Sequence, residues 1–300
     1  MSLIERLENP VVALPPEELA PLWRRMRIEL HCRCPRDFED GPDLAGRVRG
    51  AFGRQLLAME GATHLRSTQD AAHYASLYDI LFTIHGRLHA AIERPKPWVL
   101  SAERVGADLR VELTLFGFAG FWAAPAAQAL CDALVGGIAI APESRVRAKV
   151  DIGNTRISRV EGVSVTANEP RSVRLIFRTP FLVATQGALT LDPRVLLVGL
   201  ANRIRGLAHW QDLDLHLDWP GFAAAAGRLE LDHTELRYAT WHRRSIRHGA
   251  LSIPMQGIAG TITLRGVLAP FLALLAIGET AYLGKGTAFG LGRYELAIEP

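Results

Sequence analysis

The sequence predicts an α+β protein with two tandem halves, residues 1–152 and 153–300, that repeat one order of elements. Several segments alternate apolar and polar residues, which is typical of strands with one buried face. Longer segments with helical apolar spacing lie between them. The order in each half is strand, helix, strand, strand, helix, strand. This is the order of the ferredoxin-like fold. Its recurrence indicates a tandem duplication, although the halves share no visible residue-level repeat.

The composition is that of an ordinary folded protein. Hydrophobic residues make up 49% and charged residues 22% of the 300 positions, which excludes a disordered chain, a collagen-like fibre and a small disulfide scaffold. Cys32, Cys34 and Cys131 have neither zinc-site nor disulfide spacing, so we expect a reducing, cytoplasmic location. We expect no membrane span, because a proline interrupts residues 113–130 and residues 267–278 are too few. The N-terminus lacks the pattern of a secretory signal.

The first half begins with a lead-in punctuated by prolines. Residues 24–34 then alternate, with Met26, Ile28 and Leu30 on one face and charged side chains on the other, which predicts a half-buried strand. Asp43 is placed to cap a helix that continues to residue 57. The remaining segments are expected as a helical or irregular stretch at 73–91, strands at 98–102 and 108–116, a helix at 123–135 and a strand at 139–152.

The second half repeats this order. A connecting strand pair is expected at residues 153–169, and the alternation of Val173, Leu175 and Phe177 predicts a strand. Pro193 is typical of the first turn of a helix, here expected through residue 207. The other segments are strands around 213–219, 229–241 and 260–265, a helix at 268–277 and a last strand at 293–298. The helix at 268–277 is nearly all apolar, which predicts that it is well buried.

The charge is weakly basic and is carried by arginine. The net charge is +3, from 34 basic and 31 acidic residues, and lysine occurs only at Lys96, Lys149 and Lys285. Arginine suits phosphate recognition because its planar fork makes paired hydrogen bonds and stacks on bases. A GC-rich genome produces the same bias, and the composition by itself favours that explanation. Nucleic-acid binding therefore needs support from particular motifs.

The most distinctive segment is a glycine-rich loop at residues 284–292, between the apolar helix and the last strand. Glycine lets backbone amides approach a ligand, and successive amides form concavities that bind anions. Lys285 and Arg293 would add positive charge at its mouth. The loop is neither a P-loop nor a dinucleotide fingerprint, because Gly286 follows the lysine and because the loop joins a helix to a strand. We therefore expect no nucleotide cofactor. The alternative is a mobile turn without a ligand.

A run of basic residues precedes this loop. Residues 241–249 contain a tryptophan followed by five potential cations. Such a run is typical of a solvated face, and it is equally suited to follow a phosphate backbone. The sequence leaves these two alternatives open.

The C-terminal third resembles one known family. The residues that carry the resemblance are 252–264, 268–271, 278–279 and 283–294, and the string GKGTAFGLGRY at 284–294 is the most specific part. This series is similar to the C-terminal domain of the CRISPR repeat-processing endoribonucleases (CRISPR-associated protein six, of the RAMP superfamily). Residues 46–53, 77–82 and 116–119 agree more loosely with the N-terminal domain of that family. The resemblance covers most of the chain and is strong over about the last sixty residues.

The resemblance implies two ferredoxin-like (RAMP/RRM-like) domains that face each other and bind the repeat of precursor CRISPR RNA. It implies metal-independent cleavage, in which the 2′-hydroxyl of the RNA attacks the adjacent phosphorus and leaves a 2′,3′-cyclic phosphate and a 5′-hydroxyl. No metal or other cofactor is expected. The residues expected to contact RNA are Gly284, Lys285, Gly286, Thr287, Gly290, Gly292, Arg293, Arg243, Arg244, Arg247, His248, Arg47 and Arg49.

Two other functions stay open. A catalytically inactive subunit that holds CRISPR RNA in an effector complex would need the same basic loop. A metabolic enzyme on a ferredoxin-like scaffold would need a cofactor motif, which the sequence lacks. The partners implied are the repeat RNA and subunits of an effector complex, with no membrane partner, and a homodimer stays open.

RNA cleavage of this kind needs a base for the 2′-hydroxyl, a proton for the leaving oxygen and a cation for the phosphorane. Histidine suits the first two roles because its pKa of about 6.5 lies near neutral pH. In the family a histidine after the first helix commonly serves, so His64 and His73 are the candidates here, with His73 preferred. His31 is a weaker candidate on the polar face of the first strand. His85 and His89 have the spacing of a helical metal pair, but no third ligand stands out, so we interpret them as a solvent-facing pair.

Overall fold

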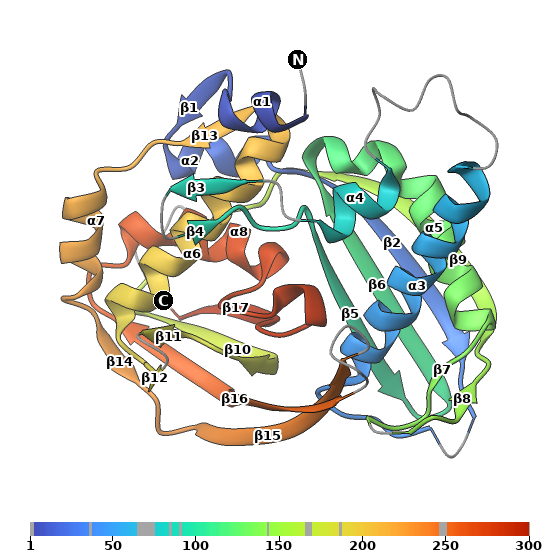
Figure 1. The fold of residues 1–300 in the computed structure, drawn as a ribbon. Helices are drawn as coiled ribbons and strands as arrows, with labels where there is room; N and C mark the ends of the chain where they lie inside the picture. Colours follow the sequence, from blue (N-terminus) through green and yellow to red (C-terminus); the bar gives the residue numbers. More distant parts are fainter. Residues whose placement is uncertain are drawn as a thin grey trace.

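The computed structural model describes residues 3–35, 38–64, 76–83, 86–89, 92–142, 144–165, 170–185, 188–245 and 251–299. These residues form two main antiparallel sheets, one in each half of the chain, together with the helices that pack on them (Figure 1). The predicted α+β class is confirmed. The order strand, helix, strand, strand, helix, strand is found in both halves.

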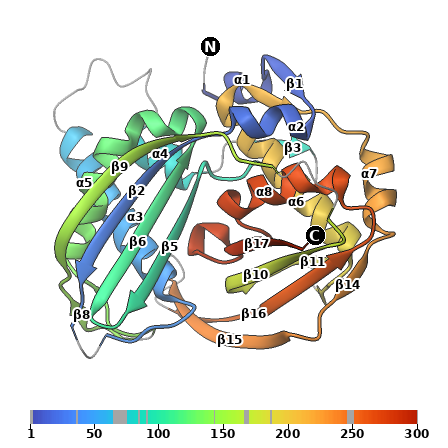
Figure 2. The same ribbon diagram turned by 180° about the vertical axis from the view of Figure 1, so that it is seen from behind.

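The first sheet has the strand order β5-β6-β2-β9. Its central strands, β2 (Arg24–Arg33) and β6 (Asp108–Phe116), pair with the edge strands β9 (Asp151–Glu161) and β5 (Trp98–Val105). The helices α3 (Leu44–His64) and α5 (Ala123–Val135) cover one face, onto which β2 directs Ile28 and Leu30. Figure 2 shows the opposite face of this sheet turned toward the viewer, with the helices behind it.

The second sheet has the order β14-β16-β10-β17, and β15 also pairs with β16. Its strands are β10 (Ser172–Phe181), β14 (Glu230–Asp232), β15 (Leu236–Ser245), β16 (Leu251–Arg265) and β17 (Tyr294–Glu299). In both sheets the first strand of the half lies between the third and the fourth, and the second lies at the edge. The main helices of this half are α6 (Pro193–Ala208), α7 (Trp219–Ala226) and α8 (Leu272–Ala281).

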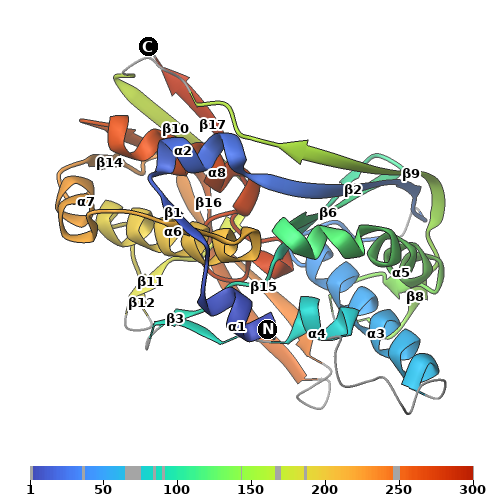
Figure 3. The same ribbon diagram turned by 90° about the horizontal axis from the view of Figure 1, so that it is seen from above.

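The shorter elements fill the connections. They are α1 (Leu3–Glu8), β1 (Val12–Leu14), α2 (Pro16–Leu19), α4 (Leu77–Phe82), β3 (Arg87–His89), β4 (Ile92–Glu93), β7 (Ile138–Ala139), β8 (Arg147–Ala148), β11 (Ala184–Thr185), β12 (Ala188–Leu189), β13 (Leu213–Leu215) and the 3₁₀ turns η1 (Ala20–Leu22), η2 (Gly117–Trp122), η3 (His209–Gln211), η5 (Ala269–Phe271) and η6 (Thr287–Phe289). The N-terminal segment lies against the second half, where β1 pairs in parallel with β13 (Figure 3).

Several predicted elements differ from the observed ones. The strand expected at 139–152 is a short hairpin of β7 and β8, and the last strand of the first sheet is β9. β9 includes residues on both sides of the predicted boundary between positions 152 and 153. The boundary between the two halves stays a prediction. Most side chains of β9 are exposed on both faces because it is an edge strand, so its sequence lacks the alternation that marks a half-buried strand.

Other differences concern the ends and types of elements. The strand expected at 229–241 is divided into β14 and β15, and the one at 260–265 is the C-terminal part of the longer β16. The described parts of 73–91, expected as helical or irregular, comprise α4 and β3. His89 lies in β3 and is exposed, as expected. His85 is outside the described residues. The apolar helix is confirmed as α8, in which nearly all side chains are buried.

The stretch Gly117–Val135 is long and apolar enough to cross a membrane, judged by length and composition alone. The expectation that proline interrupts it is wrong, because Pro125 lies in the first turn of α5, where a missing N–H is tolerated. Half of the stretch is buried, and α5 belongs to the core beneath the first sheet. This burial is typical of a core helix.

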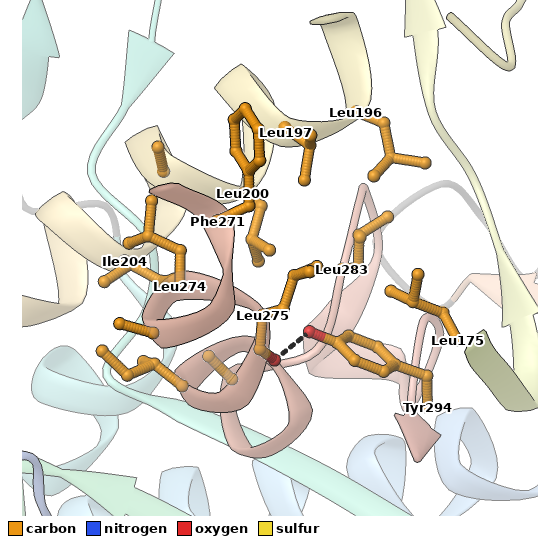
Figure 4. Packing of buried hydrophobic residues seen from close by; sticks show 14 of the residues in the cluster. Leu175, Leu196, Leu197, Leu200, Ile204, Phe271, Leu274, Leu275, Leu283 and Tyr294 are labelled. Atoms are coloured by element: carbon orange, nitrogen blue, oxygen red, sulfur yellow. Dashed lines mark hydrogen bonds between the residues drawn. The ribbon is translucent and has the colours of Figure 1, made fainter. Parts of the chain in front are cut away.

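Each sheet has its own hydrophobic core, and the two cores meet between the halves. Val99 and Phe116 of the first half join the second core, while Trp210 of the second half joins the first. Figure 4 shows the second core, where leucines of α6 and α8 surround Tyr294, whose hydroxyl donates to the Leu275 carbonyl at 2.6 Å. This shared packing fixes the glycine-rich loop, which follows α8, against the first half.

Candidate nucleic-acid interface

The glycine-rich loop between α8 and β17 is a tightly folded turn. Gly284, Gly286, Gly290 and Gly292 all have φ between 74° and 88°, the left-handed region that favours glycine. A Cβ at position 292 would lie 1.8 Å from the Leu283 carbonyl oxygen. The glycines are therefore required by the close approach of backbone to backbone.

Most amides of this loop are already used inside the protein. The Lys285 amide donates to the Leu182 carbonyl at 2.8 Å, and the Gly292 amide donates to the Pro180 carbonyl at 2.9 Å. The amides of Phe289 and Gly290 donate to carbonyls within the loop. The expected row of free amides is thus wrong at these positions. Phosphate binding at this loop must depend mainly on side chains.

Phe289 places the loop against the first half. It belongs to η6, which lies beside α3 and β5, and Figure 1 shows the loop after α8 reaching toward these elements. The Arg49 guanidinium of α3 lies 4.2 Å from the centroid of the Phe289 ring, and the Arg243 guanidinium of β15 lies 4.7 Å from the same centroid. These distances are typical of cation–π contacts. A Cβ at Gly46 would lie only 3.7 Å from this ring.

The basic side chains around the loop differ in how far they are neutralised. Lys285 is exposed. Arg293 is half-buried and faces Glu103 of β5, with 3.6 Å between Nη1 and the carboxylate oxygen. Arg243 is half-buried as well; burial lowers its pKa, and no acidic side chain among the described residues offsets this effect. Its Nε is buried without a hydrogen-bond partner in the described part of the chain.

Arg47 does not belong to this group, although the sequence places it among the RNA contacts. Its Nε lies 2.6 Å from the Asp43 carboxylate, and the side chains of this pair are only 6% and 5% exposed. Its Nη1 donates to the Ala139 carbonyl at 2.8 Å. Burial lowers the pKa of Arg47 and raises that of Asp43. Arg47 joins the start of α3 to β7 and is paired with Asp43 inside the protein. Its contact with RNA stays a prediction, which this pairing does not favour.

The predicted catalytic histidines are not brought to the loop by any described contact. His73 lies outside the described residues, as do Arg247 and His248, and Arg244 is described only through its backbone in β15. His64 is the last residue of α3. It follows Arg49 by 15 positions, and at 1.5 Å per residue the two are about 22 Å apart along the helix.

The sequence does not predict the contacts of two residues at this interface. Phe289 is one, because an aromatic residue inside a glycine-rich string gives no sign of its neighbours. Tyr282 is the other: it ends α8 with φ of 63°, unusual for a residue with a side chain. Burial raises the pKa of its hydroxyl to about 12, and the hydroxyl is hydrogen-bonded to Ser101 of β5. Tyr282 thus joins the start of the loop to the first sheet.

Comparison with known proteins agrees with this geometry. Residues 175–294 match the family model of the CRISPR-associated endoribonuclease Cas6. The resemblance to Cas6 is confirmed. The matched residues include most of β10, all of β15 and α8, and the whole glycine-rich loop. Arg243, Phe289 and Arg293 therefore all lie within the Cas6 match. No curated protein matches this chain.

Solved structures show the Cas6 fold over nearly the whole chain. Two Cas6 product complexes are each 16% identical to this chain, with TM-scores of 0.55 and 0.54; they cover 91% and 92% of it and 100% of their own chains. A partial Cas6-RT-Cas1–Cas2 complex is 11% identical, with a TM-score of 0.52, and covers 93% of this chain and 46% of its own. At such identities the likeness is one of fold, and it extends into the half that the family model leaves unmatched.

Among the described residues, no group of three or more histidine, cysteine or acidic side chains could hold a metal ion. His31 lies on the exposed side of β2, directly opposite Arg110 of β6. His242 is exposed beside Arg243 in β15. The basic side chains described around the loop are Lys285, Arg293, Arg243 and Arg49.

Proposed function

We propose that this chain is a Cas6-type endoribonuclease that binds the repeat of precursor CRISPR RNA and cuts one phosphodiester bond. The observation that carries the proposal is the match of residues 175–294 to Cas6 together with the cations around the glycine-rich loop. Lys285 is exposed and Arg243 lacks an acidic partner among the described residues, so both are suited to bind phosphate. The shared strand order of the two sheets supports tandem ferredoxin-like domains of the RAMP type.

The reaction proposed is an internal transfer. The 2′-oxygen attacks the neighbouring phosphorus as a base removes its proton, the bond from phosphorus to the 5′-oxygen breaks, and an acid protonates that oxygen. The products are a 2′,3′-cyclic phosphate and a 5′-hydroxyl. Nothing in these steps requires a metal ion. We keep His73 and His64 as the candidate base.

The path of the chain supports His73 over His64. The length of α3 separates His64 from Arg49 by about 22 Å. His73 precedes α4, whose Phe82 ring lies 5.0 Å from the Arg49 guanidinium and 5.8 Å from the ring of Phe52. The end of α4 therefore lies near Arg49 and Phe52 of α3, and His73 precedes α4 by four positions in the sequence.

The test is incubation of the full chain with RNA that contains its CRISPR repeat, in EDTA. We expect one cut per repeat and a 2′,3′-cyclic phosphate identified by mass spectrometry. His73→Ala should abolish the cut without loss of binding, and His233→Ala, at an exposed position far along the sequence, is the matched control. Tight binding with no cut by the wild-type protein would favour the inactive RNA-holding subunit instead.

A further inference from the structure

Arg243 differs from the other well-placed arginines near the loop. Arg178 is paired with Glu295, Arg27 with Glu112 at 2.8 Å, and Arg293 faces Glu103. Arg243 is half-buried, and no acidic side chain among the described residues offsets the cost of its burial. Its Nε also has no hydrogen-bond partner there, a feature that it shares with the Nε of Arg27. A partly buried charge that is not neutralised is costly. Such a charge is suited to an anionic ligand that is absent from the free protein.

Arg243 is held by a strand pairing and by the Phe289 ring, which Arg49 of the first half also contacts. It lies in β15, which pairs with β16 over its whole length. Its guanidinium lies 4.7 Å from the Phe289 centroid, and Arg49 lies 4.2 Å from the same centroid. Two cations from distant parts of the sequence are therefore gathered on one ring. The ring therefore links a cation of the first half to one of the second.

We propose that Arg243 contacts the phosphodiester that is cut and stabilises the negative charge which develops on its non-bridging oxygens, with Phe289 as the residue that positions it. This assignment rests on the proposed function. During the attack the phosphorus gains a fifth oxygen, and the phosphorane carries one more negative charge than the diester. A guanidinium donates two hydrogen bonds to such oxygens and keeps its proton throughout. The interaction is stronger in the transition state, so it accelerates the reaction.

The assignment separates Arg243 from residues that only bind RNA. A residue that contacts a distant phosphate changes the affinity and leaves the rate of the bound complex unchanged. A residue that contacts the scissile phosphate changes the rate at saturation. Phe289 touches no reacting atom in this scheme. Its loss should lower the rate only through Arg243, so that the two changes are not additive.

The experiment is single-turnover cleavage of repeat RNA with protein in saturating excess. Arg243→Ala is expected to lower the rate constant about 100-fold or more, the size found when one donor to a developing oxyanion is removed, with a much smaller change in Kd. Arg243→Lys should recover part of the rate. Arg228→Ala, at an exposed arginine after α7, is the control and should leave both constants unchanged. Thermal unfolding of each variant checks that the fold is intact.

Two further measurements distinguish the role. Replacing a non-bridging oxygen of the scissile phosphate by sulfur should slow the wild-type protein more than Arg243→Ala. Phe289→Leu should slow the wild-type protein and leave the Arg243→Ala background unchanged. An Arg243→Ala protein that cuts at the wild-type rate once saturated would overturn this assignment alone. A wild-type protein that cuts no repeat RNA would overturn the proposed function as well.

Discussion

Arg47 and Arg49 lie on the same helix, two positions apart, and have opposite environments. Arg47 is enclosed with Asp43 and tied to the Ala139 carbonyl. Arg49 extends over Phe289 at the junction of the two halves. The Arg243 guanidinium lies 4.7 Å from the centroid of the same ring. The first arginine holds the fold together, and the second belongs to a cationic surface. Two arginines on one helix thus differ in their described contacts: one faces an acid, and the other lies over an aromatic ring.

The largest effect is expected from breaking the structural pair. Asp43→Ala leaves the Arg47 charge buried without its partner, which costs about 3–5 kcal/mol of unfolding free energy. Chemical denaturation measures the loss. The double change Asp43→Ala with Arg47→Met should be much less destabilising, because no charge is then left buried. A loss below about 1 kcal/mol in Asp43→Ala would show that water reaches this pair.

A second effect tests the turn that carries Phe289 to this junction. Gly292→Ala forces a side chain into left-handed backbone, 1.8 Å from the Leu283 carbonyl oxygen, and should cost on the order of 1–3 kcal/mol. Gly199→Ala is the control, because it lies in α6 with no atom within 4 Å of the added Cβ. That change should stabilise the protein by about 0.5–1 kcal/mol. Equal stabilities of the two variants would contradict the packing described for the loop.

A smaller effect concerns the exposed side of the junction. Lys285→Ala with Arg293→Ala should weaken RNA binding and lower the slope of log K against log salt by about 1.4, from roughly 0.7 for each phosphate contact with single-stranded RNA. Binding measured at salt concentrations from about 50 to about 200 mM gives the slope. The control is Arg194→Ala with Arg228→Ala, both exposed. An unchanged slope would remove the loop from the RNA path.

The smallest effect concerns Asp214, an acid of the second half that is paired with Arg205 as Asp43 is paired with Arg47. Asp214 accepts from Arg205 at 2.7 and 2.9 Å and from His209 at 3.0 Å, and these donors hold its pKa below the usual range despite burial. The unfolded carboxyl titrates near 3.9, so the stabilisation is present above about pH 4 and is lost as the pH falls further. We therefore expect the difference in unfolding free energy between the wild type and Asp214→Asn to shrink as the pH falls from about 5 to about 2.5, because the unfolded carboxyl takes up a proton there before the folded one does. A constant difference would contradict the depressed pKa.

The sequence predicts the α+β class and the order of the principal elements because each depends on local patterns. Alternation along β2 marks its buried face, and the apolar composition of α8 marks its burial, whatever the rest of the chain does. The edge strand β9 is expected only as part of a connecting pair at residues 153–169, and its pairing with β2 in the first sheet is not predicted. Its mostly exposed side chains lack the alternation that would mark it as a half-buried strand. The division of 73–91 into α4 and β3 also depends on neighbours far along the chain.

The candidate interface is predicted only in part. The glycine-rich string predicts a turn, because glycine adopts left-handed backbone at little cost, and all four of these glycines have positive φ. The sequence also determines that cations flank this turn. Only the tertiary structure decides that most of its amides are used internally, that Arg47 faces Asp43, and that Phe289 brings Arg49 and Arg243 together. The physical reason is that charge neutralisation and burial are properties of contacts across space, and local residue spacing carries no information about them.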